Sequence, residues 1–304
     1  MPKAHIAGMT DLPETFADQI LGFSLPSRDA RGRAVRLDRV LDEILSAHDY
    51  PAPVKHLLAE ALVIAALMGS LLKEEGAQLT MQAQTQQGPV RLLVCDYRDG
   101  ELRGYADFDS AALKGLGANT SLAALFGQGA LAITFETGKG QRYQGIVPLE
   151  GASLAAACER YFYQSEQVPT LLKVGARATE SGCVAGGLLL QHLPAGEEGR
   201  ERLNAQPDHP DWEHVAILAG TLSHAELVDP ALSMEAIAWR LFHEEGEIRA
   251  EPGAHLSKGC RCTVAHFESV IARFPHSERD EMRNDAGEIV VDCAFCSREF
   301  VLRH

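Results

Sequence analysis

The apolar positions of the first quarter of the chain predict a strand and two helices. Residues 31–37 read as a short strand, and residues 38–47 have the apolar spacing of a helix. From Val54 to Leu72 apolar side chains cover more than one helical face, which predicts a helix that crosses a core. Its most apolar part, residues 61–72, is shorter than the roughly 20 residues that a bilayer requires. We therefore expect a buried helix.

The pattern then changes to the two-residue period of strands. Residues 98–100, Arg-Asp-Gly, are typical of a hairpin turn, and residues 153–167 return to helical spacing. The expected strands are residues 79–83, 90–94, 102–108, 131–135, 143–147, 170–178 and 184–190. These elements predict an α+β fold in which antiparallel sheets pack on helices.

Beyond Pro194 the chain becomes polar and then helical. We expect an N-terminal α+β domain over residues 1–195, a helical linker over residues 196–250 and a small C-terminal domain over residues 251–304, which contains four of the seven cysteines. An apolar stripe follows the linker helices. Such a stripe usually packs on a core, and it becomes a binding surface only where the helices undock. Its members are Trp212, Val215, Leu218, Leu222, Leu227, Ile237, Leu241 and Phe242.

Charge and the N-terminal sequence narrow the class of protein. Asp and Glu outnumber Lys and Arg by 42 to 28, and this balance argues against nucleic acid as a partner. The first residues carry one Lys and no continuous apolar run, so we expect neither a secretory signal nor a transit peptide. We therefore expect a cytoplasmic location and no membrane as partner. The sequence contains no arrangement typical of a hydrolase.

The cysteines carry the chemistry. Thiols stay reduced in the cytoplasm, so seven cysteines do not suggest a static disulfide framework. Four of them form a Cys-x-Cys pair and a Cys-x-x-Cys pair, and four clustered thiols suit a tetrahedral zinc site. The second pair is expected at a turn between strands at residues 288–292 and 299–302. The ligands would be Cys260, Cys262, Cys293 and Cys296, with one Zn²⁺ per chain.

The Cys-x-Cys pair also suggests reversible oxidation. Residues two apart in an extended segment lie roughly 6.6 Å apart, so a Cys260–Cys262 bond would be strained and easily reduced. Nearby cations, Lys258, Arg261 and Arg298, favour reactive thiolates. Oxidation would eject the metal, whose binding supplies about 10–16 kcal/mol of folding energy in small zinc folds. The alternative is a zinc module that only holds the C-terminus together.

The remaining candidate residues receive no role. Cys95, Cys158 and Cys183 stand singly in expected strands or helices, where cysteine behaves as a small apolar residue. His255, His266 and His276 could substitute as ligands, but four thiols already complete a zinc site.

Several further segments are informative together with the two cysteine pairs. They are residues 31–37, 143–149 (YQGIVPL), 161–167 (YFYQSEQ), 185–187 (AGG) with Gln191 and residues 193–194, and 240–245 (RLFHEE). In these segments the chain resembles the bacterial redox-regulated chaperone family known as the thirty-three kilodalton heat-shock protein, and the resemblance covers nearly the whole chain. Extra residues from Met1 to about Asp18 and a connector rich in Asp, Glu and His at residues 196–214 depart from it.

The resemblance implies an ATP-independent holdase, not an enzyme, that is inactive when reduced and zinc-bound. Oxidation would join Cys260 to Cys262 and Cys293 to Cys296, release zinc and loosen the linker. The active form, often a homodimer, would bind unfolding client proteins under oxidative stress and pass them to ATP-dependent foldase chaperones. The linker stripe is then a candidate client-binding face.

Two other functions compete with this hypothesis. A thiol-disulfide oxidoreductase would use Cys293 and Cys296 and turn over catalytically. A zinc-ribbon module would bind nucleic acid in a salt-dependent way, which the net charge disfavours.

Overall fold

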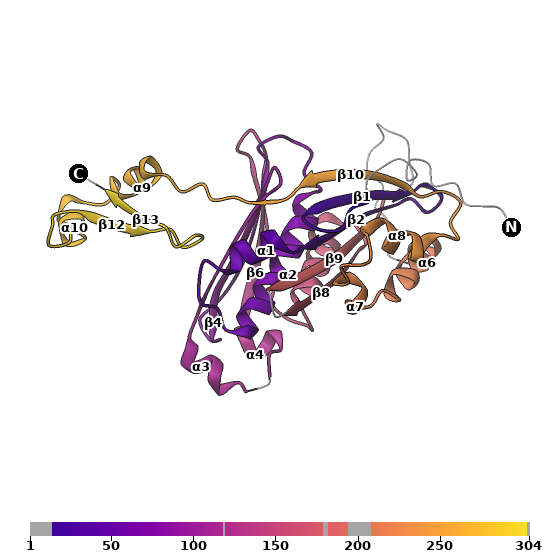
Figure 1. Ribbon diagram of the computed structural model, residues 1–304, viewed down its shortest axis with the longest axis horizontal. Helices are drawn as coiled ribbons and strands as arrows, with labels where there is room; N and C mark the ends of the chain where they lie inside the picture. Colours follow the sequence, from indigo (N-terminus) through magenta and orange to yellow (C-terminus); the bar gives the residue numbers. More distant parts are fainter. Residues whose placement is uncertain (1–13, 118, 179–181, 194–207, 303–304) are drawn as a thin grey trace.

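The computed structural model describes residues 14–117, 119–178, 182–193 and 208–302. Most of the N-terminal extension and residues 196–207 of the connector lie outside these ranges. The described chain forms two large antiparallel sheets around a central helix, a group of linker helices and a small C-terminal unit (Figure 1).

The first sheet has five strands in the order β10-β1-β2-β9-β8, all antiparallel. One of its edges is β10, which comes from the segment between the linker helices and the cysteines. The expected C-terminal domain start at residue 251 thus falls inside a strand of this sheet, and we propose that a separate C-terminal unit begins after residue 258. The strands are β1 (Gln19–Leu25), β2 (Ala30–Leu37), β8 (Thr170–Ala178), β9 (Cys183–His192) and β10 (Arg249–His255).

The second sheet has six strands in the order β11-β5-β4-β3-β6-β7. The turn at Asp99 and Gly100, both with positive φ, joins β4 to β5 as the sequence predicts. The short β11, directly after β10, pairs in parallel with β5. The strands are β3 (Gln78–Thr85), β4 (Val90–Arg98), β5 (Glu101–Phe108), β6 (Gly129–Glu136), β7 (Arg142–Pro148) and β11 (Ser257–Lys258).

Helix α2 is the centre of the main core. It is long and apolar enough to cross a membrane by length and composition, yet it packs against both sheets, and 13 of its 18 residues are buried. This confirms the expected core helix. The expected helix at residues 153–167 is α5 followed by a π-helical turn, Phe162–Glu166. The helices around the core are α1 (Arg39–Leu45), α2 (Ala52–Gly69), α3 (Ser110–Gly115), α4 (Leu122–Phe126) and α5 (Leu154–Tyr161).

The linker helices cover the other face of the first sheet (Figure 1). They are α6 (Pro210–Gly220), α7 (His224–Leu227) and α8 (Met234–Phe242). A Cβ atom at Gly186 of β9 would overlap the carbonyl oxygen of Leu227, so glycine lets α7 approach the sheet closely. Of the eight predicted stripe residues, Leu218 is partly buried, and the other seven are buried in the second core between sheet and helices.

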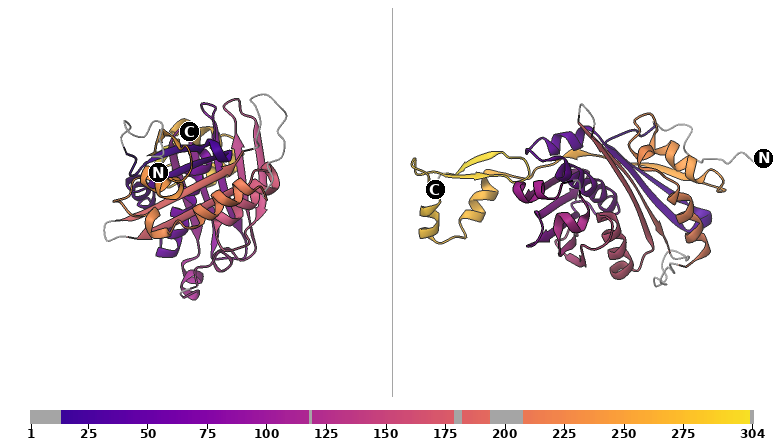
Figure 2. Two further views of the ribbon diagram at one scale, coloured as in Figure 1. Left: turned by 90° about the vertical axis from the view of Figure 1, so that its right-hand side faces the viewer. Right: turned by 90° about the horizontal axis from the view of Figure 1, so that it is seen from below.

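The C-terminal unit projects from the body of the molecule (Figure 2). It contains α9 (Val264–Ile271), α10 (His276–Glu281) and the two-stranded sheet of β12 (Ile289–Asp292) and β13 (Glu299–Leu302). Its own core is small: among the described residues, its buried cluster consists of Ile271, Ile289, Cys293, Phe300 and Leu302. So small a core supplies little hydrophobic stabilisation.

Candidate metal and redox centre

Two separate backbone segments bring the four predicted cysteines together. Cys260 and Cys262 follow β11 directly, with Gly259 donating its amide to the Leu102 carbonyl oxygen of β5 (2.8 Å). Cys293 and Cys296 lie in the turn between β12 and β13, as the sequence predicts. In this turn the amides of Cys296 and Ser297 donate to the Cys293 carbonyl oxygen at 3.2 and 2.8 Å.

The sulfur atoms lie at separations that suit one metal ion. All four lie within 4.8 Å of one another, and Sγ of Cys260 lies 3.1 Å from that of Cys262 and 3.5 Å from that of Cys293. Sγ atoms of Cys262 and Cys296 are 3.6 Å apart. Metal–sulfur bonds of about 2.3 Å in a tetrahedron would place sulfurs about 3.8 Å apart. The cluster could therefore hold a metal ion.

Electrostatics favour a cation among these sulfurs. Burial first, and then the neighbouring sulfurs, raise the pKa of the Cys262 thiol well above its usual range. Four thiolates at this spacing repel one another, and a bound metal cation removes that repulsion. The three basic residues expected to activate the thiols have other contacts: Lys258 bonds to the Glu43 carbonyl oxygen, Arg261 to Gln78, and Arg298 stacks on Phe300.

The turn that carries Cys293 and Cys296 also contacts the body of the protein. The guanidinium carbon of Arg103 on β5 lies 4.1 Å from the ring centroid of Phe295. His48 Nε2 lies 2.7 Å from the Ala294 carbonyl oxygen, and the Ser297 hydroxyl donates to the Ala47 carbonyl oxygen at 2.6 Å. Three of the residues between and just after these two cysteines therefore contact the N-terminal part of the chain.

Arg261 makes a second connection from inside the cysteine cluster. It stands between Cys260 and Cys262, and its Nη1 donates to Gln78 Oε1 on β3 at 2.5 Å. Its Nε lies 4.0 Å from a carboxylate oxygen of Glu101, while Nε and Nη2 are buried without a hydrogen-bond partner among the described residues. Burial lowers the pKa of this guanidinium, so its docked position carries an electrostatic cost.

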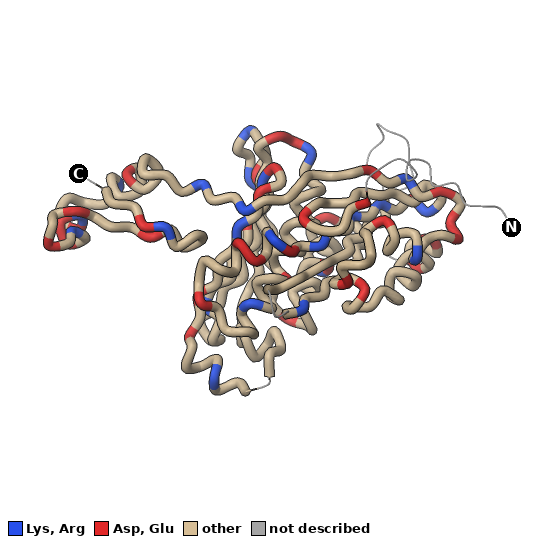
Figure 3. The backbone as a smooth tube through the Cα atoms, in the orientation of Figure 1, with Lys and Arg blue, Asp and Glu red and all other residues tan. Residues whose placement is uncertain are grey.

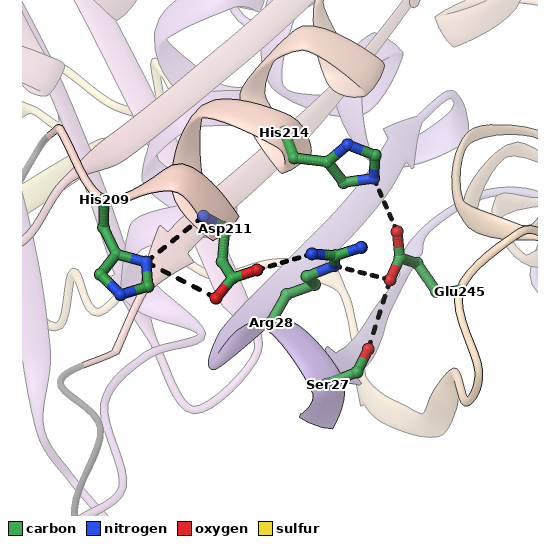
Figure 4. Close-up of polar contacts among 6 residues, drawn as sticks. All are labelled: Ser27, Arg28, His209, Asp211, His214 and Glu245. Atoms are coloured by element: carbon green, nitrogen blue, oxygen red, sulfur yellow. Dashed lines mark hydrogen bonds and ion pairs between the residues drawn. The ribbon is translucent and has the colours of Figure 1, made fainter.

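A polar cluster holds the linker to the tip of the β1–β2 hairpin (Figure 4). Arg28, in the turn Pro26–Arg28, donates to Glu245 at 2.9 Å and to Asp211 at 2.6 Å. His214 lies 2.8 Å from the other Glu245 oxygen. Burial opposes ionisation of Glu245, but the hydrogen bonds from Arg28 and His214 outweigh it and hold the pKa of this carboxyl below its usual value.

Arg36 makes the most deeply buried contact with the linker. Its side chain is 1% exposed, and its guanidinium donates to the carbonyl oxygens of Leu227 (2.8 Å) and Leu232 (2.7 Å), with a longer bond to Glu226 (3.2 Å). These bonds satisfy backbone acceptors where α7 ends and the chain turns toward α8. The sequence signal for this site is Arg36 itself, a charged residue between Val35 and Leu37 in an expected strand.

Comparison of this sequence with models of protein families identifies the family to which the chain belongs. The model of the Hsp33 protein family matches residues 18–303. The chain belongs to the Hsp33 family. Relatives include the 33 kDa chaperonin of Caulobacter vibrioides (strain NA1000 / CB15N), 41% identical over 97% of this chain and 98% of that one. The 33 kDa chaperonin of Escherichia coli (strain K12 / DH10B) is 35% identical over 93% and 91%.

A solved structure shares the Hsp33 fold. The 33 kDa chaperonin from Thermotoga maritima superposes with a TM-score of 0.76 over 94% of both chains, at 22% identity. Membership of a chaperone family means that the chain is a chaperone and not an enzyme, which excludes the oxidoreductase alternative.

Along the described backbone Lys and Arg are interspersed with Asp and Glu (Figure 3).

The three single cysteines lie away from this centre. Cys95, Cys158 and Cys183 are buried, and burial raises the pKa of each thiol. This agrees with their expected behaviour as small apolar residues. The candidate ligands His255, His266 and His276 are not part of the four-sulfur group that the described residues form.

Proposed function

We propose that this chaperone is an ATP-independent holdase switched on by oxidation. The ligand set would be Cys260, Cys262, Cys293 and Cys296, holding one zinc ion per chain in the reduced, inactive state. Four thiolate donors near tetrahedral spacing suit zinc better than the oxygen-preferring cations. Zinc, when bound, keeps the sulfurs as thiolates and ties the small C-terminal unit together.

The observation that carries the proposal is that this unit has little core of its own beside the sulfur cluster. Oxidation would join Cys260 to Cys262 and Cys293 to Cys296. Each disulfide forms as two thiolates lose two electrons, and hydrogen peroxide accepts these electrons together with two protons from solvent to become two molecules of water. Disulfide sulfurs are poor metal ligands, so the unit loses its main source of folding energy.

Loss of the folded unit has a route to the linker through the backbone. Phe295, Ser297 and Arg261 would leave their contacts with the body. One residue separates β11 from Cys260, and one residue separates β10 from β11. Disorder can therefore spread from the cysteines along these two edge strands. The chain immediately before β10 carries Glu245, which holds the polar cluster with Arg28. Helices α6–α8 would then leave the first sheet.

Undocking exposes the client-binding surface in this proposal. The buried stripe of the linker and the sheet face beneath it are both apolar and in mutual contact when docked. Separation would present them to unfolding proteins. We further propose that the active form is a homodimer in the cytoplasm and that clients pass to ATP-dependent foldases.

Light scattering of a heat-unfolded client tests the proposal. The chain is prepared reduced with zinc and, separately, peroxide-oxidised without zinc, and each is mixed with the client. Suppression by the oxidised form alone is expected. The test variant is C293S, which should suppress aggregation even when reduced because one of the four sulfurs is gone. The matched control is C158S, which removes a buried thiol outside the cluster and should keep the switch. Equal suppression by both wild-type preparations would overturn redox control.

A further inference from the structure

A cavity of about 740 Å³ opens beside the central helix, and no cysteine of the cluster lines it. Its walls come from the first turns of α2 and α5, from α4 and from β8, and His224 of the linker helix α7 completes them. Its volume lies in the range of small-molecule sites.

The lining is mainly aliphatic. Five leucines of the lining are buried, and the wall contains no Phe, Tyr or Trp in the part of the chain that the structure describes. An aliphatic ligand body fits such a wall better than an aromatic ring, which would find no ring to stack on. The leucines are Leu57, Leu122, Leu125, Leu154 and Leu172.

The basic side chains of the wall offer hydrogen-bond donors to an anion. Lys173, His56 and His224 line the cavity, and none has a hydrogen bond or ion pair from its side chain to another described residue. Lys173 has a longer-range attraction to Glu159, whose carboxylate accepts the Leu172 amide at 2.7 Å. Lys173 thus has donors left for a ligand.

The acidic group of the wall already has partners. Glu60 accepts hydrogen bonds from the amides of Leu154 and Ala155 at the start of α5, while burial raises the pKa of its carboxyl. Burial thus shifts this carboxyl toward its neutral form, which opposes an anionic ligand less than a carboxylate would.

We propose that this cavity binds a medium-chain fatty carboxylate, with the alkyl chain among the leucines and the carboxylate at Lys173. Because His224 belongs to α7, the bound ligand contacts both the core and the linker. A ligand that prefers the docked linker shifts the equilibrium toward it. This effect rests on the proposed function: the ligand would oppose activation. At ten times its Kd it would lower the undocked population by at most about tenfold, the limit for a ligand that does not bind the undocked chain.

Isothermal titration calorimetry with decanoate, below its micelle concentration, tests the site in the full-length, reduced, zinc-loaded chain. Saturable 1:1 binding is expected, at least about tenfold weaker in K173M. The matched control is K55M, which removes an exposed lysine of α2 that does not line the cavity and should bind normally. If the carboxylate charge contributes to binding, decanol should bind the wild-type chain more weakly than decanoate. This comparison does not depend on whether a variant folds. Absence of saturable binding, or equal affinity for decanoate and decanol, would overturn the site.

The same titration on the oxidised, zinc-free chain separates this inference from the proposed function. Weaker decanoate binding after oxidation is expected because α7 has left the wall. Unchanged affinity would overturn the link to the linker while the site itself stands. A chain that lacks redox-gated holdase activity but binds decanoate through Lys173 would refute the proposed function alone.

Discussion

The guanidinium of Arg103 lies over the ring of Phe295, 4.1 Å from its centroid, and so joins the second sheet to the turn between Cys293 and Cys296. Arg103 is itself held by Asp96, to which its Nε donates at 2.6 Å. The ring therefore meets a fixed cation rather than a mobile surface side chain. The position of the cysteine turn is coupled to the body by this contact.

Substitution of Phe295 should loosen that coupling. F295L keeps an apolar side chain but removes the cation–π contact, worth about 0.5–2 kcal/mol, and leaves Arg103 paired with Asp96. We expect roughly 2- to 30-fold faster hydrogen exchange at the Gly259 amide of the docked segment. The matched control is F267L, which removes a ring packed on Phe300 inside the C-terminal unit (5.0 Å between centroids). Equal exchange in the two variants would show that loss of unit stability, not of docking, is responsible.

Removal of the Arg36 guanidinium should release the linker without any oxidant. R36M leaves the carbonyl oxygens of Leu227 and Leu232 buried without their donor, at a cost of about 1–3 kcal/mol for each that stays buried. We expect the reduced, zinc-loaded variant to suppress client aggregation measurably. R33M is the control, because the Arg33 guanidinium donates to the Gly32 carbonyl oxygen and not to the linker. An R36M chain that keeps its linker docked and stays inactive would contradict the anchoring role.

The polar cluster at Glu245 predicts a pH dependence of linker docking. Since its pKa is depressed in the folded chain, its contribution to docking is complete above the usual Glu value of 4.5 and is lost as the pH falls through the lower, folded value. Acid should therefore loosen the linker below about pH 4.5, and E245Q should weaken docking at pH 7 and flatten this acid dependence.

Trp212 fluorescence measures this change, because the side chain is 8% exposed on α6. A W239F background leaves Trp212 as the reporter. The control is E247Q, whose carboxylate pairs with Arg249 at the surface and should leave the acid profile unchanged. An E245Q profile identical to that of the parent would remove Glu245 from the docking mechanism.

The sequence predicted most elements whose burial leaves a periodic pattern. It missed β1, whose four consecutive buried residues at positions 20–23 show no two-residue period, and it missed elements held by backbone pairing or distant charges. The core helix and the hairpins follow from apolar periodicity, and the cysteine turn follows from spacing. Strand β10 escaped because it is an edge strand with exposed side chains and contains Pro252 and Gly253. Its place in the sheet depends on backbone bonds to β1. Arg28 and Glu245 are 217 residues apart in sequence, so no local pattern could pair them.

Chelation of the metal should unfold the C-terminal unit and leave the inner strands of the two large sheets intact. The unit's buried cluster of five residues includes Cys293, whereas α2 and the sheets share an extensive core that contains none of the four ligands. A strong chelator added to the reduced chain should therefore abolish protection from hydrogen exchange in β12 and β13, with protection in β3 and β9 unchanged. C158S, which keeps all four ligands, should respond to the chelator as the wild type does. Protection that persists in β12 and β13 after complete metal removal would mean that packing of Phe300 and Ile289 suffices to fold the unit, and oxidation would then need another route to the linker.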